Sequence, residues 1–371
     1  MSFKKLLLAI PVLLLSVFSF AQRLTTAPDG GNKKTAVSEI IGITNVTIHY
    51  DRPAVKGREG KIWGQLVHYG FKDLGFGTSK AAPWRAGSNE NTTFTFSTDV
   101  MVEGKPLKAG TYGFFIAMGE TDATLIFSNN STSWGSFFYD DKEDALRATV
   151  KTSTLNESVE RLKYEFMDQK ENSAVVALIW EKMKIPFTVQ VDYLKTQLES
   201  FRRELRNNDG FEPNAWVEAA NFCVDHNTNL DEALVWADYA ISGAFVGQKN
   251  FKTLSAKASV LNKLNRHAEA DSLLKLAMPF ANMQELHAYG RQLMRQNKLK
   301  EALDAFKLNA QKNPDVFTTN MGLMRGYSAN GDFKNALKYA KAAQLQATDK
   351  GNKDALEKFI PLLEAGKDIN Q

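Results

Sequence analysis

The sequence predicts a two-domain protein, in which an antiparallel β-sandwich or jelly-roll-like domain is followed by an α-helical solenoid. Two observations predict this order. Between Thr35 and Asp192, apolar and polar residues alternate with period two and glycine turns separate the runs, as in half-buried antiparallel strands. After Asp192 the period becomes that of amphipathic helices, and a unit of about 34 residues recurs. A chain of 371 residues is long enough for both domains.

The first 21 residues have the pattern of a secretory signal peptide. Lys4 and Lys5 precede an apolar run, Leu6 to Phe20, and small residues at Ser19 and Ala21 suit cleavage before Gln22. The run is shorter than the ~20 residues that span a bilayer, so a retained anchor is disfavoured. We therefore expect a signal peptide at 1–21, a flexible segment at 22–35, and a periplasmic or secreted product.

Cysteine content and charge narrow the class of protein further. The single cysteine, Cys223, allows no internal disulfide, and no cysteine stands at the cleavage site to be lipidated. Loss of Lys4 and Lys5 lowers the basic residues from 46 to 44, against 42 acidic residues. A nearly neutral protein gives no reason to expect nucleic acid or anionic membranes as partners. The expected product is soluble, is not a lipoprotein and has no stable membrane insertion.

About nine short strands are expected between residues 36 and 192. They include Val46–Tyr50, Thr92–Ser97, Val100–Glu103, Thr111–Met118, Thr124–Phe127, Ala145–Lys151, Ser158–Phe166, Ser173–Trp180 and Phe187–Val191. A turn is expected at Gly104-Lys105, because glycine supplies the positive φ of tight turns. No long helical pattern interrupts the series, which favours a sandwich or jelly-roll-like barrel, with a flattened barrel as the alternative.

The loop after the first of these strands holds the candidate ligand site. Tyr50–Gly64 and Pro83–Phe96 are dense in charge, aromatic residues and glycine. Arginine suits carboxylate, phosphate or sulfate groups, and loops at sandwich ends often bind ligands. A small anionic or carbohydrate ligand is therefore one prediction, with candidate residues Arg52, Lys56, Arg58, Trp84, Arg85, Asn89 and Glu90. The alternative is that these groups pair with one another and with backbone carbonyls to pin the loop.

The same segments resemble the signature of an exported bacterial family, domain of unknown function 2911. The matching residues are Tyr50, Arg52, Pro53, Lys56, Gly57, Arg58, Trp84, Arg85, Gly87, Asn89, Glu90, Thr92, Ala109–Tyr112 and Trp134-Gly135. The resemblance covers about residues 36–192 and implies a β domain with no established activity. In two departures, His68 replaces the usual proline, and Phe71–Pro83 looks like an insertion that would cover or block a pocket.

Four segments that end in alanine mark the repeats of the helical half. Leu230–Ala233, His267–Ala270, Leu299–Ala302 and Phe333–Ala336 are spaced by 37, 32 and 34 residues, and Ala240, Ala277, Asn309 and Ala343 follow seven residues after each alanine. This pattern resembles the tetratricopeptide repeat (TPR), a helical hairpin in which small residues let two helices approach. It predicts a linking helix over 193–212, four TPR-like repeats over 213–348, and a capping helix and tail over 349–371.

The TPR resemblance implies a concave groove lined by the first helix of each repeat. Its candidate residues include Lys252, Lys263, His287, Arg291, Arg295 and Arg325. A basic groove would suit a protein or peptide partner with an acidic stretch or a C-terminal carboxylate. The alternative is that these side chains solvate an exposed helical face. The predicted function is therefore protein–protein interaction by a non-enzymatic exported protein.

Residues for catalysis and cofactor binding are sparse. The five histidines show no metal-ligand spacing, and one cysteine cannot form a thiolate zinc site. There is also no phosphate-binding glycine loop and no nucleophile-elbow serine. No cofactor, metal or catalytic residue is predicted. A less favoured alternative is a hydrolase that uses Glu90 with Asp51 or His49 as acid and base.

Overall fold

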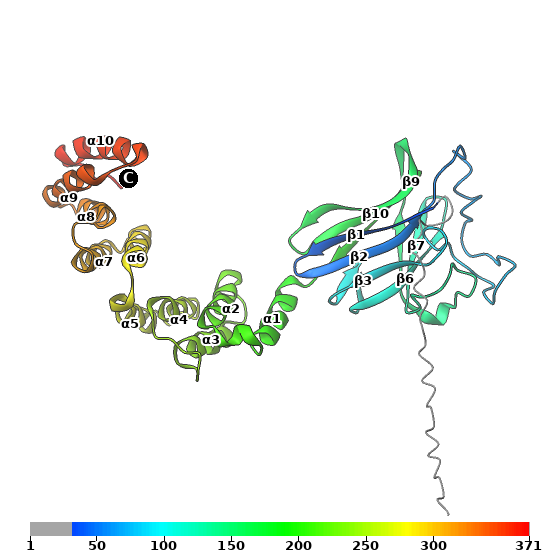
Figure 1. Ribbon diagram of the computed structural model, residues 1–371, viewed down its shortest axis with the longest axis horizontal. Helices are drawn as coiled ribbons and strands as arrows, with labels where there is room; N and C mark the ends of the chain where they lie inside the picture. Colours follow the sequence, from blue (N-terminus) through cyan, green and yellow to red (C-terminus); the bar gives the residue numbers. More distant parts are fainter. Residues whose placement is uncertain (1–31, 371) are drawn as a thin grey trace, which may run out of the picture. The chain divides into compact units, whose positions relative to one another are not determined.

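The computed structural model describes residues 32–370 of a chain that divides into two compact units, Met1–Thr196 and Gln197–Gln371 (Figure 1). The predicted signal peptide lies outside the described residues. Strand β1 begins at Lys33, within the segment that the sequence predicted to be flexible. Among residues 32–370, no helix has both the length and the apolar character that crossing a membrane requires.

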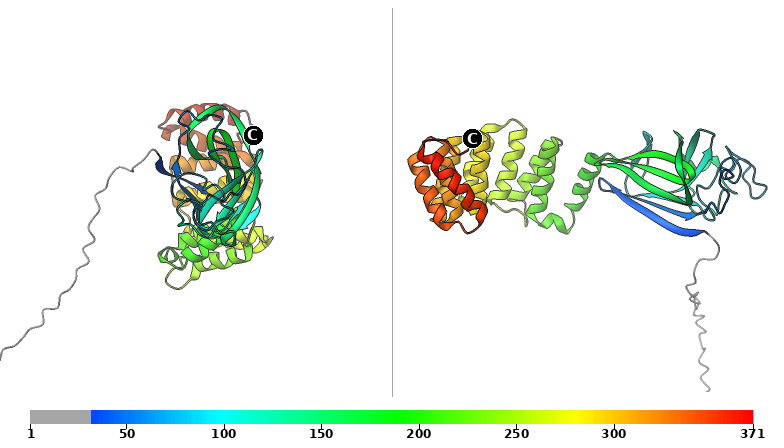
Figure 2. Two further views of the ribbon diagram at one scale, coloured as in Figure 1. Left: turned by 90° about the vertical axis from the view of Figure 1, so that its right-hand side faces the viewer. Right: turned by 90° about the horizontal axis from the view of Figure 1, so that it is seen from above.

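Two antiparallel sheets form the first unit, as predicted for a sandwich (Figures 1 and 2). One sheet has the strand order β1-β2-β3-β6-β7-β8 and the other has the order β5-β4-β10-β9. The strands are β1 (Lys33–Ile41), β2 (Thr44–Arg52), β3 (Thr92–Phe96), β4 (Val100–Val102), β5 (Lys105–Leu107), β6 (Gly110–Met118), β7 (Asp122–Ser128), β8 (Asp144–Lys151), β9 (Ser153–Lys170) and β10 (Ser173–Gln190).

Inward-facing residues of both sheets share one core. Phe94 of β3 and Phe114 of β6 pack with Phe187 of β10, and the ring centroids of Phe94 lie 4.6 and 5.8 Å from those of the other two. Each such side chain contributes about 1.5–3 kcal/mol when it is fully buried. The apolar residues that alternate along the strands thus face this core, and the polar residues between them face outward.

The two longest strands differ from the sequence prediction. Ser173–Trp180 and Phe187–Val191 belong to one strand, β10, and Ser158–Phe166 is the middle of β9. The pairing of β9 and β10 shifts register at Glu181, which has a φ of 50° and accepts a hydrogen bond from the Gly60 N–H at 3.2 Å. This bulge interrupts the period-two pattern, so the sequence suggested a break where the strand continues.

The short β4–β5 hairpin also corrects the expected turn. The positive φ angles fall on Glu103 and Gly104, and Lys105 already begins β5. Two adjacent residues with positive φ are typical of a tight hairpin turn. The predicted turn at Gly104-Lys105 was therefore one residue too late.

The second unit is a series of helical hairpins, which confirms the predicted solenoid. After α1 (Tyr193–Glu204), the helices pair as α2 (Pro213–His226) with α3 (Leu230–Ser242), α4 (Phe251–Lys263) with α5 (His267–Ala277), α6 (Met283–Arg295) with α7 (Leu299–Lys312), and α8 (Phe317–Ala329) with α9 (Phe333–Gln346). Helix α10 (Lys350–Glu364) packs on α9 through Leu356 and Leu363, as expected of a capping helix.

Small residues set the distance between paired helices. The anchor alanines Ala233, Ala270, Ala302 and Ala336 are fully buried at the start of each second helix. Gly290 of α6 lies against Phe306 of α7, and a Cβ at Gly290 would come 2.4 Å from the Phe306 Cε1. The small residues that recur in the sequence therefore mark the positions at which paired helices pack closely.

One repeat replaces a small residue by a buried amide. Asn309 stands where the other repeats have alanine and is completely buried. Its Nδ2 donates a hydrogen bond to the Met283 carbonyl at 2.8 Å, so the amide links the two helices of the third hairpin. A buried amide needs such a partner, because an unpaired one would cost about 1–3 kcal/mol.

Candidate functional site

Arg52 and Arg58 donate to backbone carbonyls of the first unit. Arg52 Nε donates to the Leu162 carbonyl at 2.8 Å, and Arg58 donates to the carbonyls of Val55 and Ala54 at 2.9 and 2.7 Å. Between them, the exposed Lys56 has a φ of 51°, and its N–H donates to Glu160 Oε1 at 3.1 Å. These contacts tie the loop after β2 to itself and to β9.

Arg85 fills a space that exists because residue 135 is glycine. Its Nη1 donates to the Asn89 carbonyl at 2.6 Å, and its Cζ lies 5.2 Å from the ring centroids of both Trp134 and Phe137. Gly135 has a φ of 73°, and a Cβ there would come 2.6 Å from the Arg85 Cζ. Burial lowers the pKa of Arg85. The Trp84-Arg85 and Trp134-Gly135 segments are thus two sides of one contact.

Trp84 belongs to the core of the sandwich. Its Nε1 donates to the Gly87 carbonyl at 3.2 Å, and its ring stacks on Trp180 with centroids 6.2 Å apart. The ring of Trp63 meets it edge-on at 5.7 Å. These rings contact one another, so their faces are largely used within the protein.

The acidic residues of the hydrolase alternative lie close together but are covered or paired. Asp51 is only 3% exposed, and burial raises the pKa of its carboxyl group. The backbone of Glu90 and the side chain of Asn89 form hydrogen bonds with this carboxyl group. The Glu90 carboxylate pairs with Lys34 Nζ at 2.6 Å. His49 is exposed on β2, opposite Thr93 of β3. The arrangement again fastens the loop to β1 and β2.

A surface hollow of about 560 Å³ in the first unit was not predicted from the sequence. Its lining residues are Phe71, Thr78, Ser79, Lys80, Ala81, Tyr139, Asp140, Asp141 and Arg147. Five of these belong to the inserted segment Phe71–Pro83, which therefore forms a wall of a hollow. A hydrogen bond of 2.9 Å from the Ser79 N–H to the Phe137 carbonyl joins this wall to the segment before Tyr139.

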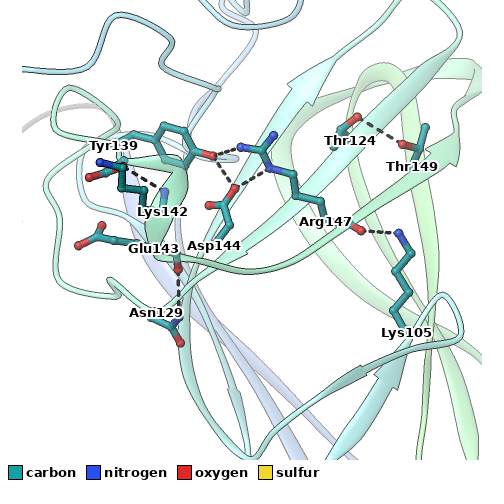
Figure 3. Close-up of polar contacts among 10 residues, drawn as sticks. Lys105, Thr124, Asn129, Tyr139, Lys142, Glu143, Asp144, Arg147 and Thr149 are labelled. Atoms are coloured by element: carbon teal, nitrogen blue, oxygen red, sulfur yellow. Dashed lines mark hydrogen bonds and ion pairs between the residues drawn. The ribbon is translucent and has the colours of Figure 1, made fainter.

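Tyr139, Asp144 and Arg147 form a connected polar group at this hollow (Figure 3). The Tyr139 hydroxyl donates to Asp144 Oδ2 at 2.7 Å, and Arg147 donates to Asp144 Oδ2 at 2.5 Å and to the Tyr139 hydroxyl at 2.8 Å. Burial raises the pKa values of Tyr139 and Asp144. The Asp144 Oδ1 is buried without a hydrogen-bond partner. The group orients Arg147 beside Phe71, whose ring centroid lies 5.4 Å from the Arg147 Cζ.

Three of the six predicted groove residues come together in the second unit. His287 and Arg291 of α6 and Arg325 of α8 are half-buried, and Arg325 Cζ lies 5.2 Å from the ring centroid of Phe359 in α10. Burial, reinforced by Arg291, lowers the pKa of Arg325 to about 10. The pKa of His287 is lowered mainly by burial and further by the charges of Arg291 and Arg325. Its Nδ1 is buried and has no hydrogen-bond partner. We call His287, Arg291 and Arg325 the groove cluster.

The other three predicted groove residues do not join this cluster. Lys252 and Lys263 of α4 and Arg295 of α6 have exposed side chains. Cys223, in α2, is completely buried, and burial raises the pKa of its thiol to about 11. A buried protonated thiol is inert, so Cys223 acts as a small buried side chain between helices.

The fold defines a β-sandwich protein with TPR-like helical repeats. Residues 32–189 match the model of the family described as "Protein of unknown function (DUF2911)", the family that the sequence signature resembles. No curated protein matches the chain.

Two solved structures are similar to part of the chain. One is described as "YrrB: a TPR protein with an unusual peptide-binding site", with 18% identity and a TM-score of 0.32, covering 45% of this chain and 84% of that chain. The other is a tetratricopeptide repeat protein from Parabacteroides merdae ATCC 43184, with 16% identity and a TM-score of 0.31, covering 47% of this chain and 67% of that chain.

Proposed function

We propose that the repeat unit binds a protein partner by holding a carboxylate at the groove cluster. The observation that carries this proposal is the environment of Arg325. Its guanidinium is desolvated and lies near a second arginine, and no acidic side chain among residues 32–370 forms an ion pair with it. Burying a charge without a counter-charge is costly, so the site is suited to an anion that a ligand supplies.

The repeat geometry supports a carboxylate as that anion. Arg291 and Arg325 occupy the same position in the first helices of consecutive hairpins, 34 residues apart in the sequence. Each guanidinium presents a planar fork of donors that matches the two oxygens of a carboxylate. The carboxylate belongs to an acidic side chain or to the C-terminus of the partner.

Fluorescence anisotropy of the full chain with a labelled oligoglutamate peptide tests this proposal. The peptide is used with a free C-terminus and as the C-terminal amide, and equal affinity of the two forms would assign the side chains as the ligand. We expect Arg325→Gln to raise the Kd about tenfold, which corresponds to about 1.4 kcal/mol. Arg206→Gln removes the same charge from an exposed position outside the hairpins and should change little.

Two outcomes would overturn the proposal for the groove cluster. The first is that neither form of the peptide binds at low salt, where charge attraction is least screened. The second is that Arg325→Gln and Arg206→Gln have the same effect, because binding would then depend on net charge alone.

We also propose that Arg52, Arg58, Trp84 and Arg85, which were candidates for a ligand site, have a structural role. We propose further that the protein works outside the cytoplasm without catalysing a reaction. The internal contacts of Arg52, Arg58, Trp84 and Arg85 support the first point. The signal pattern of residues 1–21 supports the second. Mass spectrometry of the exported protein should find Gln22 at its N-terminus, and an intact Met1 would contradict cleavage.

A further inference from the structure

We propose that the hollow formed by the inserted segment Phe71–Pro83 binds a neutral oligosaccharide. This inference is independent of peptide binding, because it concerns the first unit alone. The hollow has a volume of about 560 Å³, within the range of small-molecule sites. We call it the insertion hollow.

The charges of the insertion hollow argue against an anionic ligand. Both of its cations are already paired, Lys80 with Asp73 at 3.1 Å and Arg147 with Asp144 at 2.5 Å. Two further carboxylates, Asp140 and Asp141, also line it. An anion would therefore meet two neutralised cations and two negative charges.

The polar groups of the insertion hollow suit a ligand with several hydroxyl groups. Carboxylates accept hydrogen bonds from hydroxyl groups, and a lysine ammonium donates to them. Thr78 and Ser79 add hydroxyls that can both donate and accept. A sugar offers donors and acceptors together without a net charge, so it can use this mixed lining.

Aromatic rings beside these polar groups provide an apolar surface on which a sugar ring can pack. Phe71 lines the insertion hollow and is 41% exposed, and its ring lies 6.5 Å from that of Tyr139. The apolar C–H face of a pyranose ring can pack on such a ring, which removes apolar surface of both from water.

Further exposed rings extend from the insertion hollow and favour an oligosaccharide over a single sugar. Phe76, Trp134 and Phe138 are 65%, 59% and 53% exposed. Phe76 and Trp134 both contact Phe137, with centroids 5.3 and 6.1 Å apart, and Phe137 accepts the backbone hydrogen bond of Ser79. This group of rings is therefore continuous with the wall of the hollow, where further sugar units would lie.

Saturation-transfer NMR and calorimetry on the full chain test the proposal. The probes are cellotriose, maltotriose, xylotriose and chitotriose, with trigalacturonate as an anionic comparator and putrescine as a cationic one. We expect at least one neutral trisaccharide to bind with a Kd of about 1 mM or lower. Trp134→Ala should weaken that trisaccharide while leaving the weaker binding of its monosaccharide unchanged.

Matched variants locate the bound sugar. Asp141→Asn changes an exposed residue, and Ser79→Ala removes only the hydroxyl of a buried one, so both should leave the fold intact. These two variants and Phe71→Ala should each weaken binding at least fivefold. Leu66→Ala is the control, because Leu66 is exposed in the same loop but does not line the hollow. The proposal is overturned if no neutral trisaccharide binds at about 10 mM, if only trigalacturonate or putrescine binds, or if Asp141→Asn and Ser79→Ala bind like the unaltered protein.

Discussion

The guanidinium of Arg325 in α8 lies over the ring of Phe359 in α10, with its Cζ 5.2 Å from the ring centroid. Helix α10 thus covers one face of the Arg325 guanidinium and also packs on the apolar core of the last hairpin. A cation over a ring gains about 0.5–2 kcal/mol, which offsets part of the cost of desolvation. Besides burial, the charge of Arg291 lowers the pKa of Arg325.

Removal of the Arg325 charge should raise the pKa of His287. Burial is the largest cause of the low pKa of this imidazole, and repulsion by Arg291 and Arg325 adds to it. In Arg325→Gln one repulsion is lost and burial remains, so a partial rise is expected. An NMR titration of the His287 ring would measure it. An unchanged titration midpoint, or an equal rise in Arg206→Gln, would show that the groove cluster is not electrostatically coupled.

Stability should fall below neutral pH, in part because of His287. The pKa of His287 is lowered in the folded state, so well above the ordinary histidine pKa the imidazole is neutral in both the folded and unfolded states. As the pH falls below the ordinary histidine pKa of about 6.5, the unfolded state binds the proton first and the free energy of unfolding declines. Urea unfolding between pH 7 and pH 5 should show a shallower decline in His287→Gln. An identical slope in both proteins would contradict this assignment.

Gly290→Ala should destabilise the third hairpin. In an open helix the change would stabilise by about 1 kcal/mol, because alanine is the better helix former. At Gly290 the new Cβ would come 2.4 Å from Phe306, and such overpacking costs about 1–3 kcal/mol. Gly351→Ala in the first turn of α10 is the control, since the new Cβ would lie 3.4 Å from the Asp349 Oδ1, at an ordinary contact distance. Urea unfolding should give a lower midpoint for Gly290→Ala than for Gly351→Ala. Equal midpoints would mean that steric packing against Phe306 is not why residue 290 is glycine.

A double-mutant cycle should show coupling between Arg85 and Gly135. Gly135→Ala places a Cβ 2.6 Å from the Arg85 Cζ at a φ of 73°, so it combines a clash with backbone strain. In an Arg85→Ala background the clash is absent and only the strain remains. The cost of Gly135→Ala should therefore be smaller there, by about 0.5–3 kcal/mol in the free energy of unfolding. Additive costs would mean that the two signature segments do not act as one contact.

Tyr139→Phe should lower the free energy of unfolding of the first unit by about 1–2 kcal/mol. The hydroxyl donates to Asp144 and accepts from Arg147, so its loss leaves a half-buried carboxylate with one donor fewer. Tyr69→Phe is the matched control, because Tyr69 is 44% exposed on the loop between β2 and β3. If chemical unfolding shows no difference between the two variants, the polar group does not stabilise the loops around the insertion hollow.

The sequence by itself determined the two-unit plan and much of the repeat register. The anchor residue Ala233 and its equivalents could be found because helix pairing demands small residues at fixed positions, and such a demand repeats along the chain. Most strands of the sandwich were also predictable, because alternation between core and surface is a local pattern. The pattern failed at Glu181, where a bulge displaced the alternation inside β10.

Only the tertiary structure decided which of the candidate residues meet. It separated Lys252, which is exposed, from the half-buried His287, Arg291 and Arg325, because the burial of a side chain depends on neighbouring helices and not on charge type. It also brought the inserted segment, with Phe71, to Tyr139 and Arg147, about 70 positions later in the chain. Contacts between distant loops leave no period in a sequence, so the insertion hollow could be recognised only once both of its walls were placed.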